Sequence, residues 1–422
     1  MKELLEIKIK DCLKNLELSN EKLAIQSPKN NKFGDFSTNI ALIISKTSNK
    51  ESMEIASMIK NEINQKDNFF DDIKIIEPGF INFFINKKIF FSQLQSIITS
   101  NHHYGESNIG NKKNVLVEFV SANPTGPLTI GHGRGAILGD VICNILSWNN
   151  YNVTREYYFN NAGKQMALLG ESVYAHYCQY NNIDYNFPEQ GYQGAYIKVI
   201  AKKIFDQDGE KYIEHFDKNF FSKFAEQEIF KNIKSTLKLL NLNFDNYFNE
   251  YSLYENDAID NVLKELRKKN LLYQKDGATW IKTSLLDREH DKVILKSSGE
   301  PTYRLPDIAY HVNKFERKYD LIIDVFGADH NDTYPDVLAA LKALNYDINK
   351  IKTIIHQFVT ITENNKPVKM STRKANFISL IDLANQVGID VLRYFFIMRS
   401  SNNHLNFDLE VAKDQSDKNP VF

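Results

Sequence analysis

Cysteine is scarce in this chain of 422 residues, and its three cysteines lie far apart in the sequence. Cys12, Cys143 and Cys178 form no CxxC pair and no cluster with histidine. The sequence therefore argues against a zinc site and against a disulfide framework, and we expect no protein side chains dedicated to a metal. The scarcity of cysteine fits the reducing cytoplasm, where we expect the protein to work.

Long apolar runs are also lacking. No stretch approaches the roughly 20 apolar residues that a membrane-spanning helix needs, and the charged N-terminus has no apolar core of signal-peptide length. We therefore expect no contact with a membrane. Neither sign of charge is in excess, because 52 basic residues face 53 acidic ones. Any face that binds nucleic acid must then be a local patch.

The most informative stretch is 115–146, VLVEFVSANPTGPLTIGHGRGAILGDVICNIL. Its β-branched start predicts a buried parallel strand, and Ile137, Val141 and Ile145 form one stripe of a helix after the turn. Strand, glycine-containing turn and helix open a nucleotide-binding α/β fold, whose helix N-terminus can bind a phosphate. His132 could add a hydrogen-bond donor there. The spacing matches neither GxGxxG nor the phosphate loop, and a lone loop histidine is more often a surface residue.

The run SANPTGPLTIGHGRGA resembles the first signature of the class I aminoacyl-tRNA synthetases, written His-Ile-Gly-His in that family. Together with the preceding Glu118, it is similar to the arginyl-tRNA synthetases in particular. The first histidine of the signature is Thr129 here, and threonine can still donate one hydrogen bond. His132 stands at the second histidine.

A second loop, KPVKMSTRK, resembles the other class I signature, Lys-Met-Ser-Lys, whose lysines offset charge on the leaving pyrophosphate. Lys369, Met370 and Ser371 match, whereas Thr372 replaces the second lysine. Some arginyl enzymes carry a substitute lysine upstream of the first signature. That position is Gly126 here, so the substitute is absent. Without the resemblance, this loop would be read as a solvated basic turn.

Further stretches extend the resemblance over nearly the whole chain. PKNNKFGDFSTNIAL and EPGFINFFI are similar to the N-terminal domain of arginyl-tRNA synthetases, which touches the corner of the tRNA in that family. A domain that only packs is the alternative. NNAGKQ resembles the family's Asn-Asp-Ala-Gly-x-Gln element, with Asn161 where the family carries aspartate. Apolar runs at 320–330 and 353–361 predict two more strands.

The resemblance implies an α/β fold, namely a class I Rossmann-like parallel-sheet catalytic domain with helical insertions, preceded by a small α+β N-terminal domain. We expect the tRNA-contacting domain over 1–107 and the catalytic domain over 108–400, with a helical insertion at about 170–290. Residues 401–422 resemble the start of a helical anticodon-binding domain, and we expect the remainder of that domain to be absent.

The activity implied by the resemblance is ATP-dependent attachment of L-arginine to tRNA(Arg) through an arginyl-adenylate, with Mg²⁺ as the second cofactor. We expect a monomer. The expected catalytic residues are His132, Lys369, Thr129 and Ser371. ATP would be bound by Pro124, Gly131, His132, Gly133, Gly327, Lys369, Met370 and Ser371. Arginine would be bound by Glu118, Ser121, Asn123, His132, Tyr303, Asp307, Asp329 and His330.

The chemistry of the substrate supports two of these choices. A guanidinium group needs planar, charged acceptors, and Glu118 and Asp307 could bind opposite ends of arginine. Which acid binds which end stays open. Asp329 and His330 follow a strand, where they could line the crevice of an open sheet or simply cap a turn.

Two other functions stay open as well. Thr129, Thr372, Asn161 and the expected missing domain favour a catalytically silent RNA- or protein-binding derivative. A non-ribosomal ligase that activates arginine is the third possibility.

Overall fold

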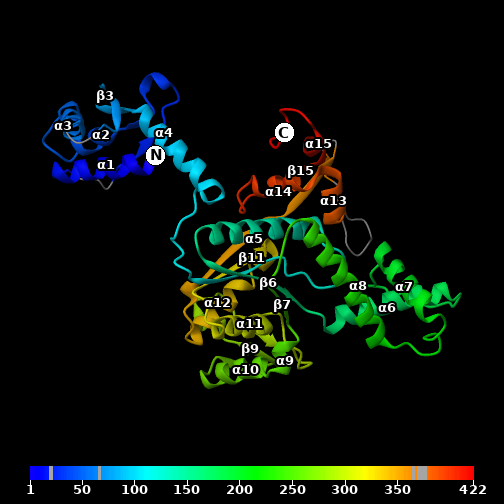
Figure 1. Cartoon of the computed structure of the whole chain (residues 1–422). Coiled ribbons are helices and arrows are strands. Elements are labelled where there is room, and N and C mark those ends of the chain that lie inside the picture. The colour runs from blue at the N-terminus through cyan, green and yellow to red at the C-terminus, as the bar shows by residue number, and fades with distance from the viewer. Residues whose placement is uncertain (19–21, 65–67, 364–365, 368–377) are drawn as a thin grey trace. The chain divides into compact units, whose positions relative to one another are not determined.

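The computed structural model of the protein describes residues 1–18, 22–64, 68–363, 366–367 and 378–422. The chain divides into two units, residues 1–106 and residues 107–422 (Figure 1). Each unit buries its own apolar core. In the part of the chain that the structure describes, none of the helices is both long enough and apolar enough to cross a membrane.

The first unit is an antiparallel sheet covered by helices. Its strands follow the order β1-β2-β4-β3, with bounds β1 (Ile25–Gln26), β2 (Phe36–Thr38), β3 (Phe70–Ile76) and β4 (Phe80–Ile85). Its helices are α1 (Lys2–Asn15), α2 (Ile40–Ser45), α3 (Ser52–Asn64) and α4 (Lys87–Ser100). Leu5, Ile9 and Leu13 recur at helical spacing along α1, and all three are buried in the core of this unit.

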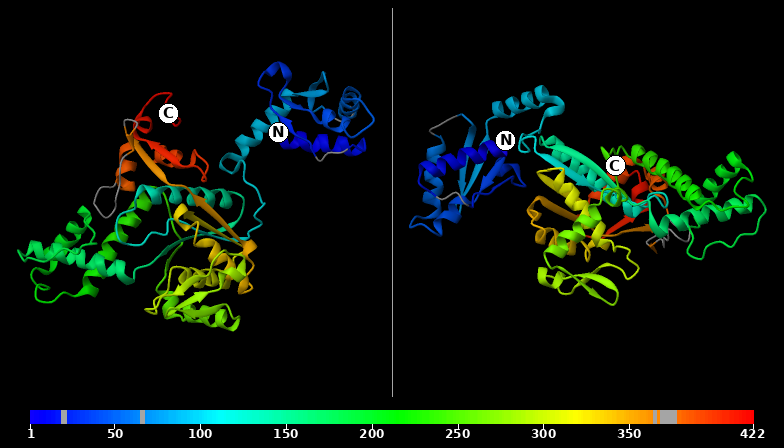
Figure 2. Two further views of the ribbon diagram at one scale, coloured as in Figure 1. Left: turned by 180° about the vertical axis from the view of Figure 1, so that it is seen from behind. Right: turned by 90° about the horizontal axis from the view of Figure 1, so that it is seen from below.

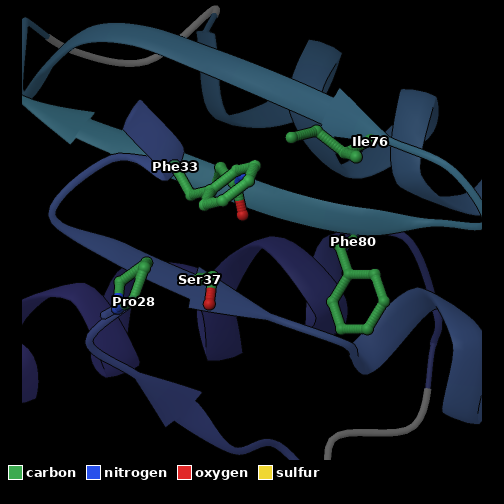
Figure 3. A pocket seen from close by; sticks show the side chains of 6 residues that line it. Pro28, Phe33, Ser37, Ile76 and Phe80 are labelled. Carbon is green, nitrogen blue, oxygen red and sulfur yellow. The ribbon is translucent and has the colours of Figure 1, made fainter. Parts of the chain in front are cut away.

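The open face of this sheet is hollowed. Ile81 and Phe83 belong to the core, and because strand residues alternate between faces, Phe80 and Asn82 point to the other side. A hollow of about 220 Å³ lies there (Figure 3), lined by Pro28, Phe33, Ser37, Ile76, Phe80 and Asn82.

The second unit is built on five parallel strands in the order β12-β11-β5-β6-β7. Their bounds are β5 (Asn114–Glu118), β6 (Asn152–Phe159), β7 (Asn246–Asn249), β11 (Leu321–Gly327) and β12 (Ile351–His356). Both faces of the sheet are covered. On β11, Ile323 and Val325 pack with Cys143 of α5 (Ile130–Trp148), whereas Ile322 packs with α11 (Arg304–Glu316) and α12 (Tyr334–Ala343). This is the parallel α/β fold that the sequence predicted.

Two insertions leave the central sheet. Between β6 and β7 lie α6 (Gly163–Tyr180), α7 (Ala195–Asp208) and α8 (Lys218–Leu239), which project from the sheet together (Figure 2). After β7 come α9 (Ser252–Glu255), α10 (Ala258–Lys268) and the small sheet of β8 (Leu272–Lys275), β9 (Ala278–Ile281) and β10 (Lys292–Leu295).

The helical insertion expected over about 170–290 is therefore interrupted, because β7, β8 and β9 also fall within this range. The helices of the first insertion end at Leu239, and β7 then joins the edge of the central sheet. The strand NYFN has only four residues, all of them half-buried. It has no alternation of buried and exposed positions that could have identified it as a strand.

The last part of the chain forms a third small sheet with the order β14-β13-β15. Its strands are β13 (Val359–Glu363), β14 (Lys366–Pro367) and β15 (Leu405–Asp408), accompanied by α13 (Leu380–Val387), α14 (Ile389–Ile397) and α15 (Leu409–Lys413). The single strand expected at 353–361 is thus divided between two sheets, β12 and β13. β15 pairs in parallel with β13 inside the second unit, whereas the sequence placed the end of the catalytic domain at residue 400.

Short 3-10 helices complete the fold at Asn31–Phe33, Asn101–His103, Thr283–Leu286, Ala328–His330 and Ile348–Lys350.

Candidate active site

The carboxyl ends of the parallel strands form one edge of the central sheet. β5 and β11 are neighbours there although about half of the chain separates them, and α5 begins just beyond β5. The strand order reverses between β5 and β11, because β6 continues the sheet on one side and β12 on the other. In open α/β sheets, the crevice at such a reversal is where ligands bind.

The loop between β5 and α5 begins with a strained turn. Val120 and Ser121 have φ angles of 70° and 45°, and the Ser121 N–H donates to the carbonyl of Phe119 at 3.0 Å. A β-branched residue rarely adopts positive φ, which costs on the order of 1–3 kcal/mol unless neighbouring structure enforces it. Three hydrogen bonds from neighbouring elements hold this loop in place. The Tyr157 hydroxyl donates to the carbonyl of Ala122 at 2.8 Å, and the Tyr196 hydroxyl donates to the carbonyl of Thr125 at 2.7 Å. The Asn160 N–H donates to Asn123 Oδ1 at 2.9 Å.

Thr129 and His132 meet at the N-terminus of α5. Thr129 is the N-cap residue, and its backbone N–H donates to His132 Nδ1 at 3.1 Å. Because Nδ1 accepts this hydrogen bond, the neutral ring carries its proton on Nε2. Burial lowers the pKa of His132 to about 4, so the ring is neutral at physiological pH. His132 therefore offers one N–H donor beside the free backbone N–H groups of the helix.

The other residues expected to bind ATP have different surroundings. Gly131 is exposed at the helix start, whereas Pro124 is buried. Gly133 faces α13 and α14, because a Cβ there would lie 2.5 Å from Leu380 and 3.1 Å from Phe396. Its lack of a side chain is thus explained by helix packing. Gly327 ends β11 next to Asp329, whose carboxylate oxygen would lie 2.5 Å from a Cβ at position 327.

One imidazole and one carboxylate lie near His132. Asp329 raises and His356 lowers the pKa of His132, so both lie close enough to act on its charge. The ring of His330 stacks on Phe326 with centroids 4.7 Å apart. Asp329 and His330 are both expected to bind arginine; Asp329 is exposed and His330 is half-buried.

Glu118 belongs to a buried charged network. Its carboxylate accepts from Ser121 Oγ at 2.8 Å and from Lys314 Nζ at 2.6 Å. Lys314 is fully buried and also donates to Asp324 at 2.6 Å. Asp324 in turn accepts from Tyr334 at 2.8 Å. Burial opposes ionisation of Asp324, but the charges and hydrogen bonds of Lys314 and His311 together outweigh burial and lower the pKa of this carboxyl group.

Asp307, by contrast, has no countercharge in contact. Among the residues that the structure describes, no hydrogen bond or ion pair reaches its carboxylate. Burial raises its pKa to about 6, and Glu118 adds to the shift. Burial raises the pKa of the neighbouring Glu250, and the charge of Asp307 raises it further. The Glu250 carboxylate accepts hydrogen bonds from Tyr158 at 2.5 Å and from Asn160 at 2.7 Å. Among the described residues, these two neighbouring acids thus have no ion-pair partner.

Tyr303 and Asn123 border the same region. Tyr303 precedes Asp307 by one helical turn, and its side chain is 78 % exposed. Asn123 donates to Gln165 at 3.2 Å and positions the start of the turn after β6. The second signature, with Lys369, Met370, Ser371 and Thr372, lies outside the described residues. Just after it, Ser379 pairs with Thr129, and Leu380 N–H donates to the carbonyl of Leu128 at 2.8 Å.

Asn161 has a specific neighbour. Its amide donates to Glu226 of α8 at 2.8 Å. An aspartate at this position would place a second carboxylate against Glu226 and could not donate. Asparagine at position 161, where the family carries aspartate, is thus compatible with the carboxylate of Glu226 on α8.

Sequence reasoning missed Glu250, Lys314, Asp324 and His356. Glu250 follows β7 directly, so the signal for it was an acid at the carboxyl end of a parallel strand, hidden because β7 was not predicted. His356 ends β12 and could have been noted on the same ground. For Lys314 we find no signal, since it reads as an ordinary charge within a helix.

Comparison with known proteins agrees with this geometry. Residues 93–393 match the family described as tRNA synthetases class I (R), catalytic domain, and residues 3–85 match the arginyl tRNA synthetase N terminal domain. The parallel sheet with a histidine at the N-terminus of α5 is thus the catalytic domain of a class I aminoacyl-tRNA synthetase. With both matches in sequence order, the chain belongs to the arginyl-tRNA synthetase family.

Individual relatives support this assignment. An arginine–tRNA ligase of Desulfotalea psychrophila is 47% identical over 425 residues, which cover all of this chain and 77% of that protein. One from Chlorobium phaeobacteroides is 48% identical over 428 residues with the same coverage. The solved structure of the Thermus thermophilus arginyl-tRNA synthetase superposes with a TM-score of 0.69 over 100% of this chain and 79% of that one. At 18% identity, that likeness supports the fold alone.

Proposed function

We propose that this chain attaches L-arginine to tRNA(Arg) through an arginyl-adenylate, using ATP. The single observation that carries the choice of arginine is the pair of acids Asp307 and Glu250, which lie close enough for Asp307 to raise the pKa of Glu250 and which make no ion pair with any described residue. A guanidinium group would supply the missing positive charge and enough N–H donors for both carboxylates. Glu118 already has Lys314 as an ion-pair partner, so we assign it to the other end of the substrate.

The reaction needs positioning and charge stabilisation more than a nucleophile of the enzyme. The carboxylate of arginine attacks the α-phosphorus of ATP, and pyrophosphate leaves. A hydroxyl group at the 3′ end of the tRNA then attacks the activated carbonyl, and AMP leaves. The Nε2–H of His132 and the N-terminus of α5 would stabilise phosphate oxygens as charge develops. Lys369 keeps its predicted role at the leaving pyrophosphate, and Ser371 stays a predicted catalytic and ATP-binding residue.

Mg²⁺ would enter with the nucleotide. Within the described ranges, no three acidic, histidine or cysteine side chains are grouped so that they could hold a metal ion. Mg²⁺ in nucleotide sites commonly takes most of its ligands from phosphates and water. We therefore propose that ATP phosphates supply most of the ligands of Mg²⁺. The expectation that the protein is a monomer stays a prediction.

The function can be tested directly with the purified chain. Total tRNA and labelled arginine would measure charging, and arginine-dependent exchange between ATP and pyrophosphate would measure adenylate formation. Charging with arginine and with no other amino acid supports the proposal. Binding of tRNA without either reaction would instead identify the silent derivative, which none of the comparisons favours. Exchange without charging would point to a ligase with another acceptor.

We also propose that the hollow of the first unit takes an unpaired base of the tRNA. Phe33 and Phe80 line it and are 46% and 41% exposed, so each offers a ring face for stacking. The buried amide of Asn82 makes no side-chain hydrogen bond within the described residues, which leaves it available to the edge of a base. Stacking together with one amide contact is a common way to bind a single-stranded nucleotide.

A test of this site compares charging kinetics. Phe80→Ala should raise the KM for tRNA about tenfold, because one base–aromatic stack contributes on the order of 1–3 kcal/mol. The KM values for arginine and ATP should not change. Phe90→Ala is a matched control, because Phe90 is 42% exposed in the same unit but lies outside the hollow. Equal tRNA affinity in both variants would rule out the hollow as a tRNA site.

A further inference from the structure

Tyr196 of the helical insertion contacts the loop between β5 and α5. It lies in the first turn of α7, and its hydroxyl donates to the carbonyl of Thr125 at 2.7 Å. Thr125 stands between Asn123 and the N-terminus of α5, where His132 is placed. A side chain of the insertion that follows β6 thus contacts the main chain of the candidate active site.

Two glycines make room for this side chain. A Cβ at Gly126 would lie 2.9 Å from the Tyr196 hydroxyl oxygen, and a Cβ at Gly194 would lie 2.2 Å from Cε1 of its ring. Both distances are too short for a real contact, so a side chain at either position would displace the tyrosine. The ring is partly buried against the core of this unit, and burial raises the pKa of its hydroxyl group.

The contact also explains a departure noted in the sequence. Gly126 occupies the position where some arginyl enzymes carry a substitute lysine. Here, the phenol of Tyr196 fills the space next to Gly126 that the first carbon of such a side chain would enter. A side chain at position 126 and Tyr196 in its present place would therefore compete for the same space.

We infer that Tyr196 is a positioning residue for adenylate formation. It fixes the main chain at Thr125 and Gly126, and through this loop it sets the placement of Thr129 and His132 at the N-terminus of α5. It touches neither Asp307 nor Glu250, so ground-state binding of arginine should not depend on it. The inference rests on the proposed function, because it assigns a role within that reaction.

The test measures arginine-dependent ATP–pyrophosphate exchange in the presence of total tRNA. In Tyr196→Phe, kcat should fall about fivefold to tenfold, because a shift of the loop by a fraction of an ångström misplaces the groups that stabilise the transition state and slows adenylate formation. The KM values for arginine and ATP should change less than about twofold, since only the transition-state arrangement is altered. Tyr174→Phe is the matched control. The Tyr174 hydroxyl also donates to a main-chain carbonyl, that of Ile213 at 3.2 Å, but inside the insertion.

A second arm tests the coupling to Gly126. Gly126→Ala should lower kcat about thirtyfold when Tyr196 is present but only about threefold in the Tyr196→Phe background, because removal of the hydroxyl relieves most of the clash. Equal losses in both backgrounds, or a Tyr196→Phe variant that matches Tyr174→Phe in kcat, would overturn the inference while the wild type stays active. A wild type without any exchange would overturn the proposed function, and the role of Tyr196 in it would fail as well.

Discussion

The main chain of Thr129 holds the ring of His132. The Thr129 N–H donates to His132 Nδ1 at 3.1 Å, and Thr129 Oγ1 lies 3.1 Å from the same nitrogen. The backbone contact does not depend on which side chain stands at position 129. The replacement of the signature's first histidine by threonine therefore still provides the backbone donor that orients His132 and places its proton on Nε2.

This relationship predicts unequal effects at the two positions. His132→Ala should lower the kcat of adenylate formation about 10²–10³-fold, as loss of one donor to a developing negative charge does. The KM for ATP should rise less than about threefold. Thr129→Val keeps the backbone donor and should cost less than about tenfold in kcat. Pyrophosphate exchange measures all three quantities. Equal losses in kcat and in ATP affinity for His132→Ala would mean that His132 binds only the ground state.

Asp307 should dominate recognition of arginine. Asp307→Ala removes one of the two carboxylates proposed to bind the guanidinium group and should cost roughly 3–5 kcal/mol, or more than about 100-fold in Kd. Calorimetric titration of arginine into the free protein would measure this change. Asp332→Ala, on the exposed turn before α12, is the control and should bind arginine like the wild type. An unchanged Kd for Asp307→Ala would disprove the assigned pocket.

The raised pKa of Asp307 predicts a pH dependence of binding. Burial raises this pKa from an ordinary value of 3.8 to about 6, so the protonated form is favoured in the free folded protein below that pH. Ionised Asp307 binds the guanidinium group, so the KM for arginine should rise as the pH falls below about 6, approaching about tenfold per pH unit. His132, with a pKa of about 4, stays neutral over most of this range and does not contribute.

Variants can assign the group that titrates. KM measured from pH 5 to 8 should become nearly flat in Asp307→Asn, which cannot ionise. Glu250 also has a raised pKa, so Glu250→Gln is needed as a second variant, and it should keep the dependence on pH. The assignment to Asp307 fails if Glu250→Gln alone flattens the profile.

Asn161 should be a poor site for the family's aspartate. Asn161→Asp replaces a hydrogen bond to Glu226 with two facing carboxylates, and it should lower the free energy of unfolding by about 1–2 kcal/mol. Glu226→Gln in the same chain restores a donor and should recover most of this loss. Urea unfolding of the two single variants and the double variant measures the coupling. Additive effects in the double variant would argue against the contact.

The sequence predicted those parts of the site that are formed by residues close together in the sequence. The β-branched run before Glu118 and the glycines before Ile137 were enough to predict β5, the loop and α5. The resemblance to the family then singled out Asp307, which no spacing would have selected. It could not provide the surroundings of that acid, because Glu250 follows a strand too short and too polar to recognise.

The charged network of Glu118, Lys314 and Asp324 could not be predicted from local sequence patterns. Lys314 and Glu118 are 196 residues apart in the sequence, and each reads as an ordinary surface charge in its own segment. Only the parallel pairing of β5 with β11, where Glu118 lies beside Asp324, brings the two acids to one side chain of α11. The network is therefore a consequence of the strand order.

Lys314 should contribute strongly to stability. It is fully buried between Glu118 and Asp324, with 2.6 Å to each carboxylate. Lys314→Met leaves two buried acids without their shared cation, and it should lower the free energy of unfolding by about 3–5 kcal/mol. Lys342→Met, at an exposed position of α12, should change it by less than about 0.5 kcal/mol. Urea unfolding at pH 7 would compare the two variants. Similar losses in both would show that Lys314 is not the countercharge that keeps Glu118 and Asp324 ionised in the core.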